Sequence, residues 1–294
     1  MAIKKVLIAN RGEIAVRIAR ACKELGIRSV AVYSEADQYS LHVKKADESY
    51  QISKDPLSGY LNPHHLVNLV VETGCDALHP GYGFLSENTA FAAACEKAGI
   101  IFVGPNARAI EVMGDKAAAR QLMATSGVPV LPGFDEEGAS DDDLVRASEQ
   151  VGFPLLIKAV AGGGGKGMRV VNNAGDFSEA LAAARREARG AFGDDRVLLE
   201  RYLPTARHVE VQVFADNHGN AVHLFERDCS VQRRHQKIIE EAPAPGLDEA
   251  TRDAFGNAAV QAAKAIDYRG AGTVEFLGRV VDLAAANFGD GDGT

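Results

Sequence analysis

The chain of 294 residues is 46% hydrophobic and 24% charged, a composition typical of a soluble globular protein with room for two domains. Its formal net charge of −8 argues against binding to the polyanionic backbone of nucleic acid. The first apolar run, residues 6–9, is too short for a signal peptide or a membrane span, so we expect no membrane association. Four cysteines lie far apart without metal-binding spacing and indicate reduced thiols in a cytoplasmic protein: Cys22, Cys75, Cys95 and Cys229.

Residues 1–113 alternate between strand and helix patterns. Apolar runs predict strands at 6–9, 29–33, 76–78 and 101–103, and helical periodicity predicts helices at 13–25, 66–73 and 88–97. This alternation is typical of a parallel, doubly wound sheet. We therefore predict an α/β fold whose first domain is Rossmann-like.

The first strand-to-helix turn indicates whether that domain binds a dinucleotide. Its sequence, Asn10-Arg11-Gly12-Glu13, has one glycine where the dinucleotide fingerprint needs three. Glu35 or Asp37, after the second strand, resembles the acid that reads a ribose, but acids are common in such loops. The sequence therefore predicts a Rossmann-like fold without a nicotinamide cofactor.

The region from residue 114 onward predicts a second, α+β domain. Its expected helices span 116–126, 142–151 and 176–189, and its expected strands span 154–160, 168–172, 197–201, 209–214, 221–226 and 270–276. Residues 135–143 are acidic and rich in turn formers, so we expect an exposed connection there. Residues 216–220 are expected to close a hairpin between two of the strands.

A glycine-rich segment, Gly162-Gly163-Gly164-Gly165-Lys166-Gly167, joins two of these predicted strands. Four glycines often form a flexible linker, but both flanks are apolar strands, whereas a linker has polar borders. Bare backbone at a hairpin tip lets several amides approach an anion closely, and Lys158 and Lys166 supply positive charge. It is not a P-loop, because no Ser or Thr follows Lys166 and the segment enters a strand. We predict a phosphate-binding loop.

The most basic segment of the chain is residues 226–237, in which five of twelve side chains are cationic or can become so. A solvated basic face is the simpler interpretation. Apolar residues on both sides favour partial burial, and buried cations need anionic partners. A small oxyanion substrate is therefore a candidate ligand.

Three further features are weaker when each is taken alone. Lys116 opens a helix, where a lysine is usually solvated. Residues 200–203 leave a strand and either read an adenine edge through their backbone or form a plain strand end. Glu275 lies in an apolar strand and is either an exposed residue or a ligand for Mg²⁺, which typically takes one or two carboxylates besides phosphate oxygens.

Together these motifs resemble those of biotin carboxylase, an ATP-grasp ligase found in biotin-dependent acyl-CoA and pyruvate carboxylases. The resemblance covers residues 2–277 and rests on residues 8–15, 79–88, 113–116, Lys158 with the glycine loop, 227–237, 240–245 and 268–276. The most specific string is Arg-Asp-Cys-Ser-Val-Gln-Arg-Arg-His-Gln-Lys at 227–237.

The resemblance implies a Rossmann-like domain over 1–113, an incomplete ATP-grasp domain over 114–277 with a lid at about 131–203, and an atypical tail over 278–294. The implied nucleotide contacts are Lys116, Lys158, Gly164, Gly165, Glu200, Arg201, Tyr202, Leu203, His208, Gln232 and His235. Lys237 matches a bicarbonate contact, and Glu275 matches the first ligand of Mg²⁺ (or Mn²⁺).

The implied reaction is attack of bicarbonate on the γ-phosphoryl group of MgATP to give carboxyphosphate, whose CO₂ then carboxylates biotin on a carrier. Lysines and metal would offset charge on the phosphoryl group, and a closed lid would exclude water. The implied partners are bicarbonate, a biotin carboxyl carrier protein or domain, a carboxyltransferase subunit and a second copy in a homodimer. The implied compartment is the cytoplasm, or an organellar matrix if a targeting segment was removed.

The sequence departs from the family pattern after Leu277. The family has a second Mg²⁺ glutamate there, then an asparagine, a catalytic arginine and a further domain, whereas residues 278–294 contain no glutamate and are rich in Ala, Gly and Asp. Our hypothesis is a truncated reading frame with a foreign tail, impaired catalysis and an unpaired sheet edge. Asp282 is a formal substitute for the missing ligand.

Two other functions stay open. One is a non-enzymatic ATP-binding or assembly module. The other is a different ATP-grasp ligase, similar to carbamoyl-phosphate synthase, against which the string at 227–237 argues.

Overall fold

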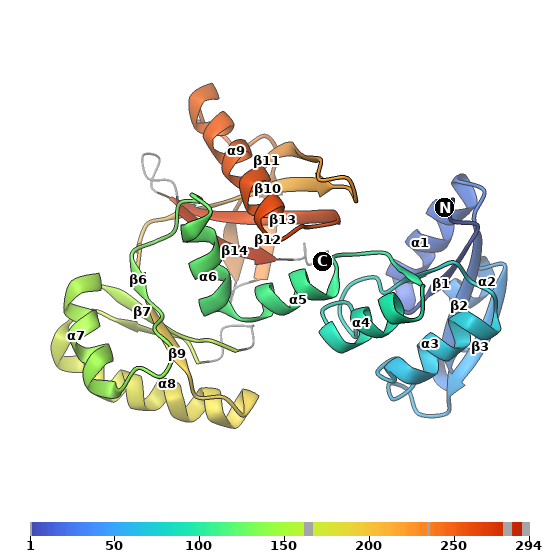
Figure 1. Ribbon diagram of the computed structural model, residues 1–294, viewed down its shortest axis with the longest axis horizontal. Helices are drawn as coiled ribbons and strands as arrows, with labels where there is room; N and C mark the ends of the chain where they lie inside the picture. The colour runs from blue at the N-terminus through green and yellow to red at the C-terminus, as the bar shows by residue number, and fades with distance from the viewer. Residues whose placement is uncertain (1, 162–166, 234–235, 279–283, 290–294) are drawn as a thin grey trace. The chain divides into compact units, whose positions relative to one another are not determined.

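The computed structural model describes residues 2–161, 167–233, 236–278 and 284–289, with backbone only for 284–289 (Figure 1). The chain forms two compact units. Unit 1 comprises Met1–Glu111 with Tyr268–Gly270, and unit 2 comprises Val112–Asp267 with Ala271–Asp292. Helix α5 (Ala107–Gly114) leads from the first unit into the second.

Unit 1 is built on a parallel sheet with the strand order β3-β2-β1-β4-β5. The strands are β1 (Lys5–Ile8), β2 (Arg28–Ser34), β3 (Glu48–Ser53), β4 (Ala77–His79) and β5 (Ile101–Phe102). The helices are α1 (Gly12–Glu24), η1 (Glu35–Asp37), α2 (Leu41–Lys45), α3 (Pro63–Glu72) and α4 (Thr89–Lys97). The predicted α/β fold with a parallel, doubly wound sheet is confirmed.

Both faces of the unit 1 sheet are covered, because alternate residues of β1 enter different cores. Leu7 packs with Leu66 and Phe91 on one face, and Ile8 packs with Ala15 and Ile18 of α1 on the other. Burial on both faces explains why the strand reads as a continuous apolar run. The sequence patterns missed β3, since its residues Glu-Ser-Tyr-Gln-Ile-Ser form a polar, largely exposed edge strand.

Unit 2 contains an antiparallel sheet with the order β6-β9-β7-β8. Its elements are α6 (Lys116–Thr125), β6 (Gly133–Phe134), α7 (Asp141–Val151), β7 (Leu155–Ala159), β8 (Arg169–Val171), η2 (Ala174–Asp176), α8 (Phe177–Phe192) and β9 (Val197–Arg201). Helices α7 and α8 lie along one face of this sheet (Figure 1). Leu144 and Leu181 of these helices pack there against Ile157.

The second sheet of unit 2 has the order β12-β11-β10-β13-β14. Its strands are β10 (Arg207–Ala215), β11 (Ala221–Arg233), β12 (Gln236–Glu241), β13 (Gly270–Gly278) and β14 (Ala284–Gly289), and helix α9 (Glu249–Ala265) packs on it. Two predictions need correction. The basic segment, expected to follow a strand, is itself strand up to Arg233 and continues in β12. The edge beside β13, expected to be unpaired, is paired antiparallel with β14.

Helix α9 was not predicted, because its apolar face is made of small residues that give a weak periodic signal. Gly256 shows why: a Cβ at this position would lie 2.5 Å from the His223 ring, so the helix approaches β11 closely. Such tight packing needs small side chains, and alanines fill much of the rest of this face.

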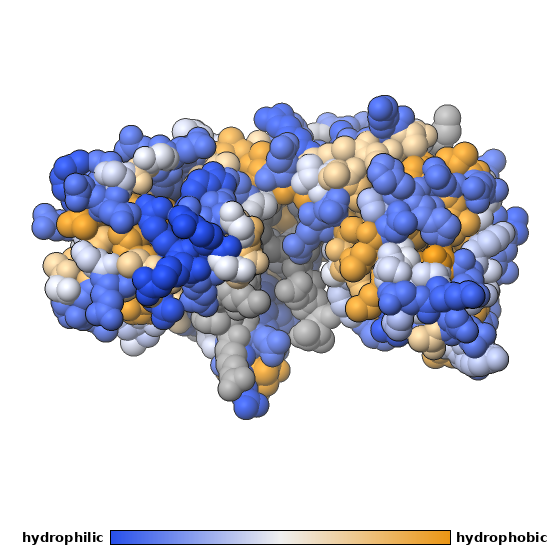
Figure 2. Space-filling model, turned by 90° about the horizontal axis from the view of Figure 1, so that it is seen from below, coloured by the Kyte–Doolittle hydropathy of each residue, from blue (hydrophilic) through white to orange (hydrophobic). Residues whose placement is uncertain are grey.

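The surface seen in Figure 2 is mostly hydrophilic, with apolar residues scattered among polar ones. Scattered apolar residues are normal on a folded protein and do not by themselves mark a binding site. Among the described residues, no helix is both long and apolar enough to cross a lipid bilayer.

Candidate functional site

The predicted phosphate loop lies mainly outside the described residues, which exclude Gly164, Gly165 and Lys166. Its last residue, Gly167, is described and has a φ of +70°. A Cβ at Gly167 would lie 2.8 Å from the Cβ of Ala159, so neither the backbone conformation nor the space suits a larger residue. The glycine at this end of the loop is therefore required by the fold.

Two lysines and a glutamate form the first charged cluster. Alternation along β7 places Ile157 in the core and Lys158 on the opposite face, where its ammonium contacts the carboxylate of Glu200 on β9. Both residues are buried, with exposures of 7% and 8%. Lys116, the first residue of α6, reaches the same place and donates to the carbonyl oxygen of Ala159 at 3.4 Å.

Burial and the charge of Lys158 lower the pKa of Lys116, whereas Glu200 and Asp115 act in the opposite direction. The two lysines and the buried carboxylate of Glu200 together carry an excess of positive charge. An anion can offset that excess, which makes this cluster (Lys116, Lys158 and Glu200) a candidate phosphate site.

Residues 200–203, the predicted adenine-reading segment, leave β9 with part of their backbone already hydrogen-bonded. The Arg201 amide donates to the carbonyl oxygen of Pro132 at 2.8 Å, and the Tyr202 amide donates to that of Pro154 at 3.0 Å. These two donors are therefore used by the fold. An adenine contact through the backbone of Leu203 stays a prediction.

The second charged cluster lies on β10–β13 and centres on Glu210. Lys237 of β12 contacts both Glu210 of β10 and Glu275 of β13, the latter at 3.4 Å. Arg227 of β11 donates from Nε to Glu210 at 2.7 Å and from Nη1 to Gln212 at 3.2 Å. Arg227 and Lys237 of the basic string are partly buried, as predicted, whereas Arg233 is exposed. The anions nearest to Arg227 and Lys237 are carboxylates of the chain itself.

Glu210 and Glu275 differ in how deeply they are buried and in how many cations of the protein they contact. Glu210 is 1% exposed and serves two cations, whereas the side chain of Glu275 is 24% exposed. Burial by itself lowers the pKa of Lys237, but the hydrogen bond to Glu210 and the charge of Glu275 raise it overall. Lys237 is thus held as an ammonium beside a partly accessible carboxylate.

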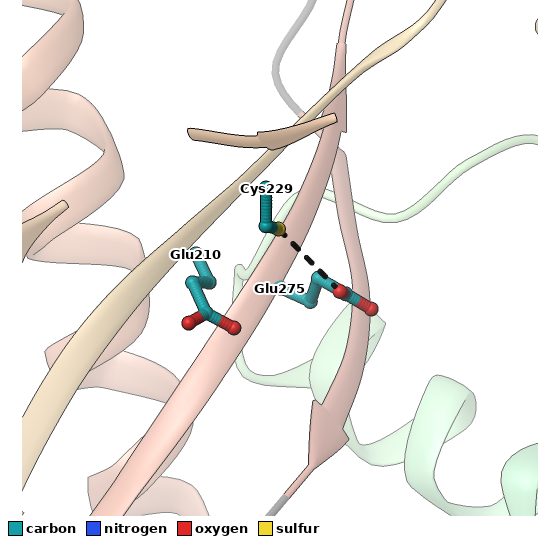
Figure 3. Close-up of side chains that lie close together, drawn as sticks. All are labelled: Glu210, Cys229 and Glu275. Carbon is teal, nitrogen blue, oxygen red and sulfur yellow. Dashed lines mark hydrogen bonds between the residues drawn. The ribbon is translucent and has the colours of Figure 1, made fainter. Parts of the chain in front are cut away.

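The expected metal ligand, Glu275, lies within a group of three side chains whose ligand atoms are all within 4.8 Å of one another (Figure 3). The other two members are Glu210 and Cys229, and the thiol of Cys229 donates to Oε1 of Glu275 at 3.8 Å. Burial and the Glu275 charge raise the pKa of Cys229 to about 12, so the thiol stays protonated and is a poor ligand for a hard cation.

Of the three side chains in this group, one offers a donor that suits Mg²⁺. Glu275 offers an accessible carboxylate oxygen, which Mg²⁺ prefers, while Glu210 is committed to Arg227 and Lys237. Asp282, the formal substitute for a second ligand, lies outside the described residues. The fit therefore rests on one carboxylate, with the remaining positions left for phosphate oxygens and water.

Two of the three other expected nucleotide contacts, His208 and Gln232, lie within the described residues. The His208 amide donates to the Ser230 hydroxyl at 3.0 Å, which ties β10 to β11 beside the second cluster. The Gln232 side chain donates to the Cys229 carbonyl oxygen at 3.0 Å. His235 lies outside the described residues.

Sequence reasoning missed Glu210, the residue that organises the second cluster. A signal was available in the run Val209, Glu210, Val211, Gln212 and Val213, where apolar and polar residues alternate. The valines are buried, so the polar residues share the opposite face. A glutamate in the middle of such a strand needs a partner, which the basic segment of the next strand supplies.

In unit 1, the residue that resembled a ribose-reading acid serves the fold instead. The Asp37 carboxylate accepts hydrogen bonds from Arg11 Nε at 2.6 Å, from Tyr60 at 2.9 Å and from Ser34 at 3.2 Å. The Arg11 hydrogen bond is the main cause that lowers the pKa of Asp37 to about 2. Asp37 is thus engaged by residues of unit 1, and the absence of a dinucleotide stays a prediction.

The chain matches two family models. Residues 2–110 match the one described as "Biotin carboxylase, N-terminal domain", and residues 115–283 match the one described as "Carbamoyl-phosphate synthase L chain, ATP binding domain". Among curated relatives, the alpha subunit of mitochondrial methylcrotonoyl-CoA carboxylase from Dictyostelium discoideum is 56% identical over 276 residues. Biotin carboxylase from Halalkalibacterium halodurans is 54% identical over 275 residues.

Two solved structures share the fold. Biotin carboxylase from Campylobacter jejuni, solved as a β,γ-ATP complex, has a TM-score of 0.93 and 47% identity over 98% of this chain and 65% of its own. The biotin carboxylase domain dimer of 2-oxoglutarate carboxylase from Hydrogenobacter thermophilus, solved with MgADP, ADP and bicarbonate, has a TM-score of 0.92 and 46% identity over 99% of this chain and 64% of its own.

The chain spans only part of the curated relatives. The matched region covers 94% of this chain but 40% of the Dictyostelium subunit, and 93% of this chain but 61% of the Halalkalibacterium enzyme.

Proposed function

Because the chain belongs to the biotin carboxylase family, we propose that it binds MgATP and bicarbonate for the ATP-dependent carboxylation of carrier-bound biotin. The observation that carries this proposal is the second cluster. There, Lys237 is held as an ammonium by Glu210 beside the accessible carboxylate of Glu275. A cation for an anionic substrate and a ligand for a metal thus lie side by side.

Each residue of the second cluster has a proposed part. Lys237 binds bicarbonate through its ammonium and fixes it for attack on the γ-phosphoryl group of ATP. Glu210 keeps that ammonium in place, and Arg227 holds Glu210 from its other side. Glu275 would hold Mg²⁺, which supplies charge neutralisation on the transferred phosphoryl group when it is bound.

The nucleotide is proposed to bind at the first cluster. Lys116 and Lys158 bind phosphate oxygens, and the Leu203 amide reads the adenine edge. The loop that contains Gly164 and Gly165 is proposed to close over the phosphates. Exclusion of water would then protect carboxyphosphate from hydrolysis.

The proposed partners follow from the relatives. The Hydrogenobacter domain is described as a dimer, which supports a homodimer, and the Dictyostelium relative is a subunit of a methylcrotonoyl-CoA carboxylase. We propose a biotin carboxyl carrier protein or domain as the source of biotin, and a carboxyltransferase subunit as the acceptor of the carboxyl group. The proposed compartment is the cytoplasm, or an organellar matrix.

The proposal is tested with the purified chain, MgATP, bicarbonate and free biotin. Because no glutamate follows Glu275 as a second metal ligand, we expect impaired catalysis, seen as slow ADP release that depends on both bicarbonate and biotin. Lys237→Gln should lose this ADP release while keeping its affinity for ADP. The matched control is Lys44→Ala, which removes an exposed lysine of unit 1. ADP release that ignores biotin contradicts the proposal.

A second candidate function is a non-enzymatic ATP-binding or assembly module. The observation that favours it is the sequence after Glu275, which contains no second glutamate for the metal. This module would bind ADP and ATP without turnover. Biotin-dependent ADP release by the purified chain would exclude it.

A third candidate function is a ligase similar to carbamoyl-phosphate synthase. The observation that favours it is the match of residues 115–283 to the ATP-binding domain model of that enzyme. Such an enzyme passes the activated carboxyl group to a nitrogen source other than biotin. ADP release stimulated by ammonia and not by biotin would favour it.

A further inference from the structure

We propose that the Glu200 side chain is a positioning residue of the nucleotide site, which holds Lys158 in place and keeps Lys116 charged for the approaching phosphate. The inference rests on the proposed function and deepens it. Family resemblance implies only that Glu200 contacts the nucleotide. The role proposed here belongs to its carboxylate and acts through the two lysines.

The first observation is the geometry of the ion pair. Strands β7 and β9 are antiparallel neighbours, and Leu156 pairs with Glu200 while Lys158 pairs with Leu198. Lys158 and Glu200 are therefore diagonal neighbours on one face of the sheet, and their charged atoms are in direct contact. Because both residues are more than nine-tenths buried, loss of either one leaves the other charge without its partner in a dry environment.

The second observation is the crowding of positive charge around that pair. Among the described residues, the charged groups that act on Lys116 include Lys158 on β7, Glu200 on β9 and Asp115 at the start of α6. Asp115 already accepts hydrogen bonds from two α6 amides at 3.0 Å, and Arg196 lies 3.6 Å from its other oxygen. Glu200 is therefore the carboxylate that chiefly offsets the repulsion between the two lysines.

Loss of the Glu200 charge has two opposite effects on phosphate binding. It removes a repulsive charge near the phosphate, and it lets Lys116 lose its proton at a lower pH. Where Lys116 is still protonated only the first effect acts, and as the pH rises the second effect opposes it. The diagnostic property is therefore the pH dependence of nucleotide affinity, which a purely structural ion pair would not change.

The first test compares Glu200→Gln with the unaltered chain by calorimetric titration with ADP. The pH above which the affinity falls should lie lower in Glu200→Gln than in the unaltered chain, because Lys116 without the Glu200 charge loses its proton at a lower pH. Glu200→Asp, which keeps the charge, should restore most of the profile of the unaltered chain.

The matched control is Asp135→Asn. This substitution breaks another part-buried ion pair of unit 2, in which Arg120 and Asp135 are 2.9 Å apart with side-chain exposures of 16% and 12%. It should lower the stability of the chain without changing how the affinity for ADP depends on pH. A fall of affinity at the same pH in Glu200→Gln as in Asp135→Asn overturns the inference.

The second test needs no ligand. Lys116 is labelled with an amine-reactive reagent at a series of pH values, and the midpoint of its labelling is read by mass spectrometry. The midpoint should lie lower in Glu200→Gln than in the unaltered chain. If Glu200→Gln does not fold, Lys158→Gln is compared with the double variant Lys158→Gln/Glu200→Gln, in which the midpoint should again be lower.

An unchanged Lys116 midpoint in these pairs overturns the inference, whatever the chain does with nucleotides. If the unaltered chain binds no ADP, the proposed function fails, and the labelling alone decides the role of Glu200. The two failures are thus distinguishable.

Discussion

Two buried carboxylates, Asp37 in unit 1 and Glu210 in unit 2, are surrounded in different ways. Asp37 has one cationic partner, Arg11, and two hydroxyl donors, Tyr60 and Ser34. Glu210 has two cationic partners, Arg227 and Lys237. In the first arrangement, donors of the fold satisfy the hydrogen-bonding capacity of a buried carboxylate. The second uses a carboxylate to hold cations at a surface that a ligand can reach.

The partners also differ in how easily they reach water. The Arg11 side chain is 44% exposed, so its charge can be solvated when Asp37 is lost, whereas those of Arg227 and Lys237 are 26% and 25% exposed. The comparison teaches that burial of a carboxylate does not by itself mark a site. Of these two buried carboxylates, the one in the candidate site holds two cations, and the one that serves the fold holds one.

The largest expected effect is that of Glu210→Gln on stability. Loss of the carboxylate removes the buried anion that Arg227 and Lys237 share and leaves them with the more distant Glu240 and Glu275. We therefore expect the free energy of unfolding to fall by about 3–5 kcal/mol in urea denaturation. Asp37→Asn should cost less, because Arg11 reaches solvent. Glu241→Gln, at an exposed carboxylate on β12, is the control and should stay within about 0.5 kcal/mol. An equal loss in Glu210→Gln and Asp37→Asn would break the comparison.

The second expected effect is a pH dependence of unit 1 that comes from His79. Burial lowers the pKa of His79 from 6.5 to about 4, and its Nδ1 accepts a hydrogen bond from the Gly81 amide at 3.0 Å. Between these two pH values the unfolded chain binds more protons than the folded chain, so stability falls as the pH falls from 6.5 to about 4. The loss should reach about 3 kcal/mol, and none is expected from this group above pH 6.5.

The measurement is the free energy of unfolding across that pH range in the unaltered chain and in His79→Asn, whose side-chain oxygen can still accept from the Gly81 amide. The slope of stability against pH between 6.5 and 4 should be smaller in the variant. Identical slopes would show that another group causes the acid sensitivity.

The third expected effect concerns function and belongs to unit 2. Lys158→Ala removes an ammonium from the candidate phosphate site, so the affinity for ADP should fall by about 2 kcal/mol, or about 30-fold. Lys44→Ala, an exposed lysine in unit 1, should leave the affinity unchanged. Isothermal titration with ADP measures both, and equal affinities would remove Lys158 from the site.

The smallest expected effect concerns a loop of unit 1. Gly81 has a φ of +67°, and a Cβ there would lie 2.7 Å from Nδ2 of Asn10, which donates to the Pro80 carbonyl oxygen. Gly74 has a φ of +64° and open space around it. Gly81→Ala should therefore cost about 1 kcal/mol more than Gly74→Ala in thermal or urea unfolding. Equal costs would mean that Asn10 moves aside freely.

Much of the fold could be predicted from the sequence, because strong patterns come from elements that are buried on one or two faces. Strand β1 was evident from its apolar run, and the predicted helix 116–126 ends one residue later than α6. Strand β3 and helix α9 could not be found in this way. The first is a polar edge strand, and the second packs through small residues whose periodicity is weak.

The candidate site could be predicted only residue by residue. Lys116, Lys158 and Lys237 were named from motifs, but the sequence says nothing of the carboxylates that pair with them. Glu200 was expected to act through its backbone, and Glu210 was missed. Ion pairs between neighbouring strands depend on register, and register is not written in the local sequence.

The sequence by itself determined the class of the fold and the family. It also determined which residue types are available to bind phosphate and bicarbonate. These properties follow from periodicity and from local motifs. Only the tertiary structure decided which carboxylate holds which cation, because strands far apart in the sequence bring those charges together. Lys237 and Glu210 are 27 residues apart, and Lys158 and Glu200 lie on different strands. Their pairing is a property of two folded sheets, since Coulomb attraction acts through distance in space and not along the chain.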